Sequence, residues 1–96
     1  MNEQEKTDVR IFMESMEREL LMNEFKDGWI GCETSYLVEQ FRKKTHTIKH
    51  ICDISFIQLL NEYENSETIV QFLQQQLADL ANYAMMISGN MGRTLK

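Results

Sequence analysis

The segment QLADLANYAMM, residues 76–86, carries two polar groups that need partners. Asp79 stands in an otherwise apolar helical stretch, and Asn82 follows three residues later. A carboxylate in such surroundings is costly unless a cation or a hydrogen-bond donor pairs with it. The amide of Asn82 requires partners for the same reason. We therefore expect Asp79 to face either a cation on a neighbouring helix or water at a partly open surface.

A cluster of cations precedes this segment. Residues 42–50, RKKTHTIKH, contain four cations and no acidic residue. The four are Arg42, Lys43, Lys44 and Lys49. Lysine binds phosphate as a point charge, so the cluster could hold a nucleotide without a metal. The alternative is a solvated face that complements the acidic N-terminal segment, which is the commoner role of a charge run.

Other residues in the chain also have types suited to binding. His46 and His50 have the i, i+4 spacing of a helical zinc pair, but no HExxH or CxxC accompanies them. We therefore interpret them as structural or solvated histidines. Trp29 and Tyr83 could stack on a base, although core packing is the simpler role for an aromatic side chain. Met13, Met16 and Met85 are expected in the core.

The overall composition favours one small soluble domain. The chain has 96 residues, of which 43% are hydrophobic and 26% are charged. Its net charge of −5 argues against general nucleic-acid binding. Cys32 and Cys52 do not form a disulfide framework, which favours a reduced cytoplasmic location. The N-terminus lacks a signal peptide's apolar core, and no apolar run approaches the roughly 20 residues of a membrane span.

The hydrophobic periodicity predicts helix almost throughout. Residues 4–26 have apolar positions at three-to-four spacing, and Gly28 suits the left-handed cap position. A second helix beginning near Thr34 carries an apolar stripe from Leu37 to Cys52. A shorter helix is expected after Asp53, and a last helix is expected over residues 67–88. We expect residues 89–96 to form a frayed tail.

The last predicted helix has an apolar stripe of its own. Its members are Ile69, Leu73, Leu77, Leu80, Ala81, Ala84 and Ser88. No strand pattern or repeat accompanies the helices. The sequence therefore predicts a single all-α domain over residues 1–96, built as a bundle of three to four helices. The small core of such a domain favours completion by dimerisation.

The order of these features resembles a known family. A bend containing Trp29 precedes a helix that begins Tyr36-Leu37, and residues 79–87 of the last helix read DLANYAMMI. This pattern is similar to the small MazG-like, all-α nucleoside triphosphate pyrophosphohydrolases, many of which are phage-encoded. The resemblance covers roughly residues 24–90 and implies a MazG-like helical domain that forms a homodimer. It also implies that Asn82 contacts a nucleotide base.

The family's chemistry depends on carboxylates that this chain lacks. The motifs E-E-x-x-E and E-x-x-D on two helices hold Mg²⁺ beside the triphosphate, because hard cations need oxygen ligands. Counted from Tyr36-Leu37, the five positions fall on Lys43, Lys44, Thr47, Gln76 and Asp79. Four of the five acids are absent, and two have become ammonium groups that repel Mg²⁺. We therefore expect no catalytic residue, no metal and no cofactor.

The resemblance then implies a degenerate, non-catalytic protein. We expect Lys43 or Lys44 to pair with Asp79 across the bundle, where relatives hold a metal. The expected function is binding of another macromolecule, for example as a phage-encoded regulator or inhibitor of a host protein. One alternative is a metal-free nucleotide sensor that uses Lys43, Lys44, Asn82 and Tyr83. Another is a residual pyrophosphohydrolase with a different ligand set: Glu39, His46, His50 and Asp79.

Overall fold

The computed structural model describes residues 1–25, 27–53 and 66–95 and contains three helices in them. Helix α1 spans Glu3–Met22, α2 spans Thr34–Asp53, and α4 spans Ser66–Thr94. The described residues contain no strand, so the all-α prediction is confirmed. The predicted short helix after Asp53, with Phe56, Leu59, Leu60 and Tyr63, lies outside these ranges. No described helix offers an apolar stretch capable of crossing a membrane.

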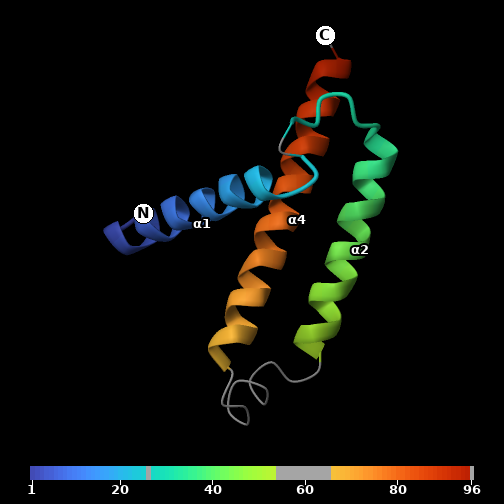
Figure 1. The fold of residues 1–96 in the computed structure, drawn as a ribbon. Coiled ribbons are helices and arrows are strands. Elements are labelled where there is room, and N and C mark those ends of the chain that lie inside the picture. Colours follow the sequence, from blue (N-terminus) through green and yellow to red (C-terminus); the bar gives the residue numbers. More distant parts are fainter. Residues whose placement is uncertain (26, 54–65, 96) are drawn as a thin grey trace.

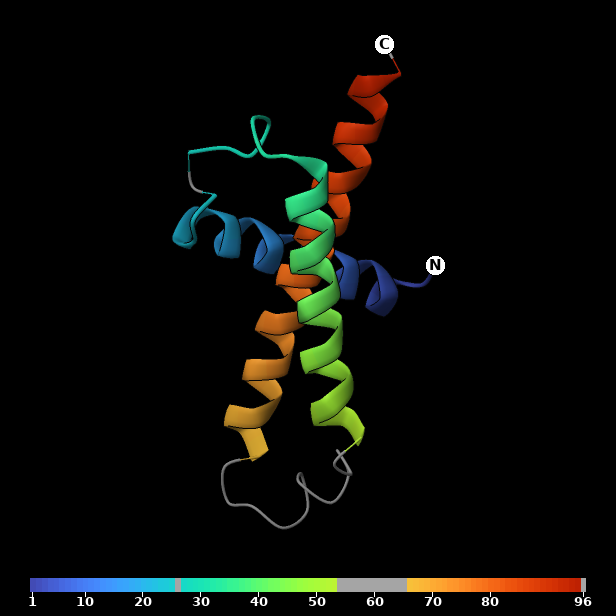
Figure 2. The ribbon, with the colours of Figure 1, turned by 90° about the vertical axis from the view of Figure 1, so that its right-hand side faces the viewer.

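Helix α4 lies at the centre of the arrangement. Both α1 and α2 pack against α4, whereas the described parts of α1 and α2 do not pack against each other. Figures 1 and 2 show α2 running antiparallel to α4, while α1 crosses α4 near its middle and extends away from it. Because α4 has a neighbour on two sides, the polar groups of residues 76–83 face both other helices. This arrangement positions the candidate site.

Helix α1 begins with a capping box and ends earlier than expected. The Asn2 side-chain oxygen accepts a hydrogen bond from the backbone N–H of Glu5, and the Glu5 carboxylate accepts one from the backbone N–H of Asn2. The prediction that this helix continues to residue 26 is wrong, because the chain becomes extended at Asn23. Gly28 adopts the expected positive φ of 104°, but it does so in a turn after Phe25 rather than as a helix cap.

The C-terminal residues correct a second expectation. We expected a frayed tail over residues 89–96, but α4 continues through Gly89 and Gly92 to Thr94. Asn90 explains the difference, because its buried amide donates to the Cys32 carbonyl at 3.2 Å. This bond joins the last turns of α4 to the loop before α2. A contact between distant parts of the chain therefore stabilises a helix end that contains two glycines.

The core is small and centred on the α1–α2 connection. Its buried cluster consists of Phe25, Leu37 and Met86. Leu20, Trp29, Cys32, Tyr83 and Ile87 pack around that cluster. The expectation that Met13 and Met85 belong to the core is wrong, because both are exposed, while Met16 is half-buried. The methionine that fills the core is Met86, which is fully buried.

The buried side of α4 differs from the predicted apolar stripe. The buried positions of this helix are Leu73, Ala78, Asn82, Met86 and Asn90. Leu77, Ala84 and Ser88, which the stripe includes, are exposed. Two of these buried positions are asparagines, and each side-chain amide donates a hydrogen bond to a backbone carbonyl of another segment. A search for apolar periodicity cannot place such residues inside.

Candidate functional site

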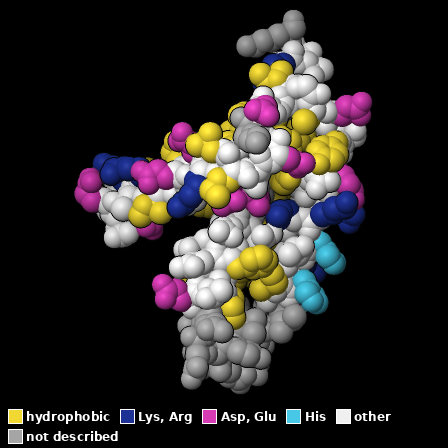
Figure 3. Space-filling view, viewed as in Figure 1, with side chains coloured by type: hydrophobic (Ala, Val, Ile, Leu, Met, Phe, Trp, Pro, Cys, Tyr) yellow, Lys and Arg dark blue, Asp and Glu magenta, His cyan; other side chains and the backbone are white. Residues whose placement is uncertain are grey.

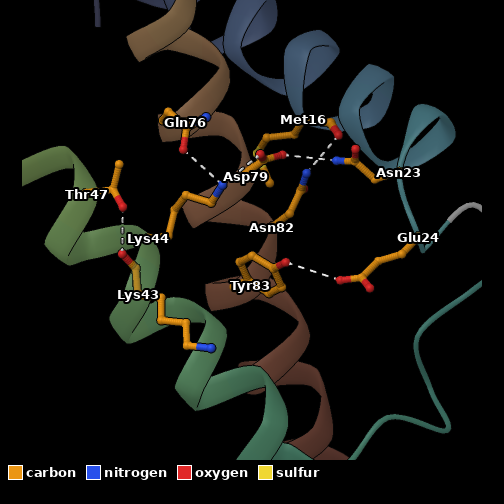
Figure 4. A network of polar contacts seen from close by, with 10 residues as sticks. All are labelled: Met16, Asn23, Glu24, Lys43, Lys44, Thr47, Gln76, Asp79, Asn82 and Tyr83. Carbon is orange, nitrogen blue, oxygen red and sulfur yellow. Dashed lines mark hydrogen bonds and ion pairs between the residues drawn. The ribbon is translucent and has the colours of Figure 1, made fainter.

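Asp79 faces a cation of a neighbouring helix, through an ion pair between α2 and α4. The Lys44 Nζ lies 3.4 Å from Asp79 Oδ2 and donates a hydrogen bond of 2.9 Å to Gln76 Oε1 (Figure 4). The Lys44 and Asp79 side chains are 24% and 17% exposed. The structure thus brings together three of the five residues of the predicted former metal site, and the ammonium group lies between the other two side chains.

The second carboxylate oxygen of Asp79 has a partner near α1. Asn23 is the residue that follows the last turn of α1. Its Nδ2 donates a hydrogen bond of 3.2 Å to Asp79 Oδ1. Both oxygens of Asp79 are therefore engaged, one by a segment next to α1 and one by α2 (Figure 4). Asp79, which lies on α4, links this helix to α2 and to the segment that follows α1 through charge-assisted hydrogen bonds, which are stronger than neutral ones.

Asn82 makes a further connection to α1. Its side chain is only 3% exposed, and its Nδ2 donates to the Met16 carbonyl at 2.9 Å (Figure 4). Its Oδ1 is buried without a hydrogen-bond partner. A cavity of about 10 Å³ lies beside it, with Leu20 and Phe25 among its lining residues. That volume is about the size of one water molecule. Because the Asn82 side chain is so deeply buried, it is not available to the base of a bound nucleotide.

Glu24 connects two tyrosines of the site, Tyr36 and Tyr83. The Tyr36 hydroxyl of α2 donates to Glu24 at 3.3 Å, and the Tyr83 hydroxyl of α4 donates to it at 3.5 Å. Tyr83 also packs edge-to-face against Phe25, with ring centroids 5.7 Å apart. Burial and the Glu24 charge raise the pKa of Tyr83 to about 12. Burial and the same carboxylate also raise the pKa of Tyr36.

These residues surround an open pocket of about 300 Å³. Its lining residues are Asn23, Glu24, Lys44, Asp79 and Tyr83. Two carboxylates and one ammonium group give the pocket an excess of negative charge. Such a pocket can accept hydrogen bonds from an amide or a cationic group, and it disfavours a phosphate. Of the nucleotide-binding set predicted from the sequence, Lys44 and Tyr83 line the pocket, but both are already engaged with a carboxylate.

The remaining predicted cations lie outside this pocket. Lys43 and Lys49 are exposed, and Arg42 forms a bidentate pair with Glu39 on the same helix. The hydrogen bond from Arg42 lowers the pKa of Glu39. Thr47 donates to the Lys43 carbonyl rather than to Asp79 (Figure 4). Lys43 and Thr47 are therefore the two predicted former metal-site residues that do not approach the others.

Basic and histidine side chains form an outer face on α2. Figure 3 shows Lys, Arg and His side chains along this helix, away from α4. His46 and His50 are exposed there. Across the described ranges, no three His, Cys, Asp or Glu side chains are grouped so that they could hold a metal ion. Trp29 packs against the core cluster, which agrees with core packing for this residue.

Two site residues, Asn23 and Glu24, were not identified from the sequence. Both follow α1, where the chain leaves the helix axis and approaches α4. No local motif could have found them, because their contacts depend on where α1 crosses α4.

Comparison with known proteins identifies no relative, since no family model, curated protein or solved structure matches this chain.

Proposed function

We propose that this chain is a degenerate MazG-like protein that lacks pyrophosphohydrolase activity and acts by binding another protein in the cytoplasm. The observation that carries the proposal is the position of Lys44 Nζ, 3.4 Å from Asp79 and 2.9 Å from Gln76. An ammonium group beside the one remaining acid neutralises the charge that a divalent cation would need. In this proposal the homodimer is the working form, and the partner is a host protein if the chain is phage-encoded.

The pocket chemistry also favours a protein partner over a nucleotide. Glu24 supplies an exposed carboxylate at this open pocket, whereas Asp79 and the neighbouring cation, Lys44, already pair with each other. A basic or amide side chain of a partner would complement this pocket. A triphosphate would have to displace Lys44 from Asp79 and approach two carboxylates. The metal-free nucleotide sensor therefore has less support, since Asn82 is also buried and bonded to Met16.

A pyrophosphate-release assay tests the loss of chemistry. Each common nucleoside triphosphate is incubated with the purified protein and Mg²⁺ or Mn²⁺. We expect no protein-dependent release of pyrophosphate. Release that scales with protein concentration would overturn the non-catalytic part of the proposal. Calorimetric titration with dUTP, dCTP and their monophosphates tests the sensor alternative, and measurable heat of binding would favour that alternative.

Capture of a partner from a plausible host lysate tests the binding role. The wild type is compared with Lys43→Glu and Lys49→Glu, which change the exposed basic face of α2, and with Glu24→Gln, which changes the pocket. Lys6→Glu is the control, because it makes the same charge reversal on α1. We expect one specific protein to be lost from the basic-face or pocket variants and kept by the control. Equal capture by all four variants would contradict a role for these surfaces.

A further inference from the structure

The hydrogen bonds that described residues give to the Glu24 carboxylate are long. Its Oε1 accepts from the Tyr36 hydroxyl at 3.3 Å and from the Tyr83 hydroxyl at 3.5 Å, and its Oε2 accepts from Tyr36 at 3.4 Å. O–H···O bonds in proteins are ordinarily about 2.5–3.0 Å long, so the two phenols hold this carboxylate weakly. The Glu24 side chain is also exposed, and it therefore keeps acceptor capacity on both oxygens for a stronger donor.

The charge of the open pocket favours one added positive group. Glu24 and Asp79 contribute two negative charges to its lining, and Lys44 contributes one positive charge. The Lys44 Nζ is engaged by Asp79 and Gln76, and no ion pair in the described part of the chain reaches Glu24. One monovalent cation beside Glu24 brings the formal charge of the pocket to zero, whereas a phosphate makes it more negative.

A buried oxygen without a donor adjoins the pocket. The Asn82 side chain is 3% exposed, and its Oδ1 has no hydrogen-bond partner among the described residues. Asn82 lines the cavity of about 10 Å³, and three other residues of that cavity also line the pocket: Asn23, Asp79 and Tyr83. Figure 4 shows the Asn82 amide beside Asp79 and Asn23. A donor in the pocket can therefore reach this oxygen through one water molecule held in the cavity.

We propose that this pocket binds the guanidinium group of an arginine side chain of the partner protein. Two N–H groups of the planar guanidinium donate side by side to the two oxygens of Glu24, which is the geometry that Arg–carboxylate pairs favour. The remaining N–H groups face Asp79 and the small cavity beside Asn82. This inference rests on the proposed function and names the partner side chain that the pocket accepts.

The surroundings of Glu24 favour arginine over lysine. An ammonium group is a compact, strongly hydrated point charge, whereas a guanidinium is less hydrated, has five N–H donors and stacks on aromatic rings. The Tyr83 ring lines the pocket, and Tyr36 is 42% exposed next to it. Each ring offers a face for such stacking. Because the pKa of Tyr83 is raised to about 12, its phenol adds no negative charge near neutral pH.

An NMR titration with a blocked amino acid tests the site. Nitrogen-15-labelled wild-type protein is titrated with N-acetyl-L-argininamide, and N-acetyl-L-lysinamide is the comparison. We expect saturable shifts of the Asn23, Glu24 and Tyr83 backbone signals, with a dissociation constant on the order of 1 mM for so small a ligand. The lysine compound should bind about fivefold more weakly, because it lacks the second parallel hydrogen bond. No saturable shift, or equal binding of the two compounds, would overturn the inference.

A matched pair of glutamates tests the assignment of Glu24. Glu24 and Glu33 are both exposed, but only Glu24 lines the pocket. Glu24→Gln should lose about tenfold in affinity for the arginine compound, because its charge-assisted hydrogen bonds become neutral. Glu33→Gln should bind like the wild type. Wild-type affinity in Glu24→Gln, or an equal loss in Glu33→Gln, would contradict the assignment. Circular dichroism checks that both variants keep their helices.

Two buried asparagines test the part assigned to the cavity. Asn82 and Asn90 each donate to a backbone carbonyl, but Asn90 lies about 12 Å further along α4. We expect the arginine compound to shift the side-chain amide signals of Asn82 and to leave those of Asn90 in place. Equal shifts of both, or Asn82 signals that do not move, would overturn the role of the cavity.

Failure of this inference is distinguishable from failure of the proposed function. If the arginine compound does not bind and Lys43→Glu loses the captured protein, the partner uses the basic face of α2 and only this inference fails. If the wild type binds the arginine compound and also releases pyrophosphate, the non-catalytic proposal fails and the guanidinium site remains.

Discussion

Lys44 of α2 and Asp79 of α4 face each other across the helix pair, with Nζ and Oδ2 3.4 Å apart. The other two ion pairs among the described residues are Lys6–Glu3 on α1 and Arg42–Glu39 on α2, and each joins exposed side chains three positions apart on its own helix. Because both Lys44 and Asp79 are largely shielded from water, this pair is screened less than those surface pairs. The ion pair gives Asp79, the one acid present at the five positions compared with the family's motifs, a cationic partner within its own chain.

The first prediction compares Lys44 with its neighbour Lys43. Lys44→Met should lower the free energy of unfolding by about 1–2 kcal/mol, because Asp79 would keep a half-buried charge without its cation. Lys43→Met should change it by less than about 0.5 kcal/mol, because that side chain is exposed. Urea unfolding measures both. Equal effects of the two substitutions would show that the pair contributes no specific stability.

The second prediction concerns the attachment of α1. Asn82→Ala removes the hydrogen bond to the Met16 carbonyl and should cost about 1–2 kcal/mol. Asn23→Ala removes an exposed hydrogen bond to Asp79 and should cost less than about 0.5 kcal/mol. Amide hydrogen exchange in α1 should speed up in Asn82→Ala and stay nearly unchanged in Asn23→Ala. Faster exchange in the second variant alone would contradict this account of α1 docking.

The helical fold was predictable because its signals are local. The chain contains no proline, and the apolar spacing of α1 and α2 repeats every three to four residues. The end of α4 was not predictable in the same way. Gly89 and Gly92 indicate a helix stop, yet the Asn90 bond to Cys32 joins residues 58 positions apart and holds the helix. A contact of that kind is invisible to any reading of neighbouring residues.

The candidate site was predictable in part. An isolated carboxylate at Asp79 and a run of cations on an earlier predicted helix are enough to suggest an ion pair, but not to choose between Lys43 and Lys44. The choice depends on the rotation of α2 about its axis, which places Lys44 toward α4 and Lys43 toward solvent. Glu24 joins the site only because the chain leaves α1 at Asn23. No sequence pattern records that departure.

The third prediction concerns alkaline pH. The pKa of Tyr83 rises from 10.0 to about 12 in the folded protein, so the folded state favours the neutral phenol. The stability that this provides is complete below pH 10 and is lost as the pH rises toward about 12. Tyr83→Phe should therefore reduce the alkaline loss of unfolding free energy by about 1–2 kcal/mol.

Urea unfolding at about pH 9 and about pH 11.5 measures this difference. Tyr36→Phe is the comparison, because Tyr36 also donates to Glu24 and its pKa is also raised. It is more exposed than Tyr83, so its effect should be smaller. An alkaline loss of stability that is identical in the wild type and Tyr83→Phe would rule out this contribution.

The fourth prediction compares Gly28, whose backbone conformation requires glycine, with Gly92, whose helical conformation does not. Gly28 has φ +104° in the turn after Phe25, so Gly28→Ala should cost about 1 kcal/mol through backbone strain. Gly92 lies inside α4 with open space where a Cβ would point, so Gly92→Ala should stabilise the protein by about 0.5 kcal/mol. Thermal unfolding gives the sign of each change. Destabilisation by Gly92→Ala would contradict the helical assignment of the C-terminal residues.

The most direct test of the central claim is a crystal structure determined after soaking with Mn²⁺, with anomalous scattering used to locate the ion. We expect no Mn²⁺ peak at Asp79 and a Lys44 ammonium group that still lies within hydrogen-bonding distance of Asp79 and Gln76. A Mn²⁺ ion coordinated by Asp79, with Lys44 displaced from it, would show that the ion pair does not replace a metal.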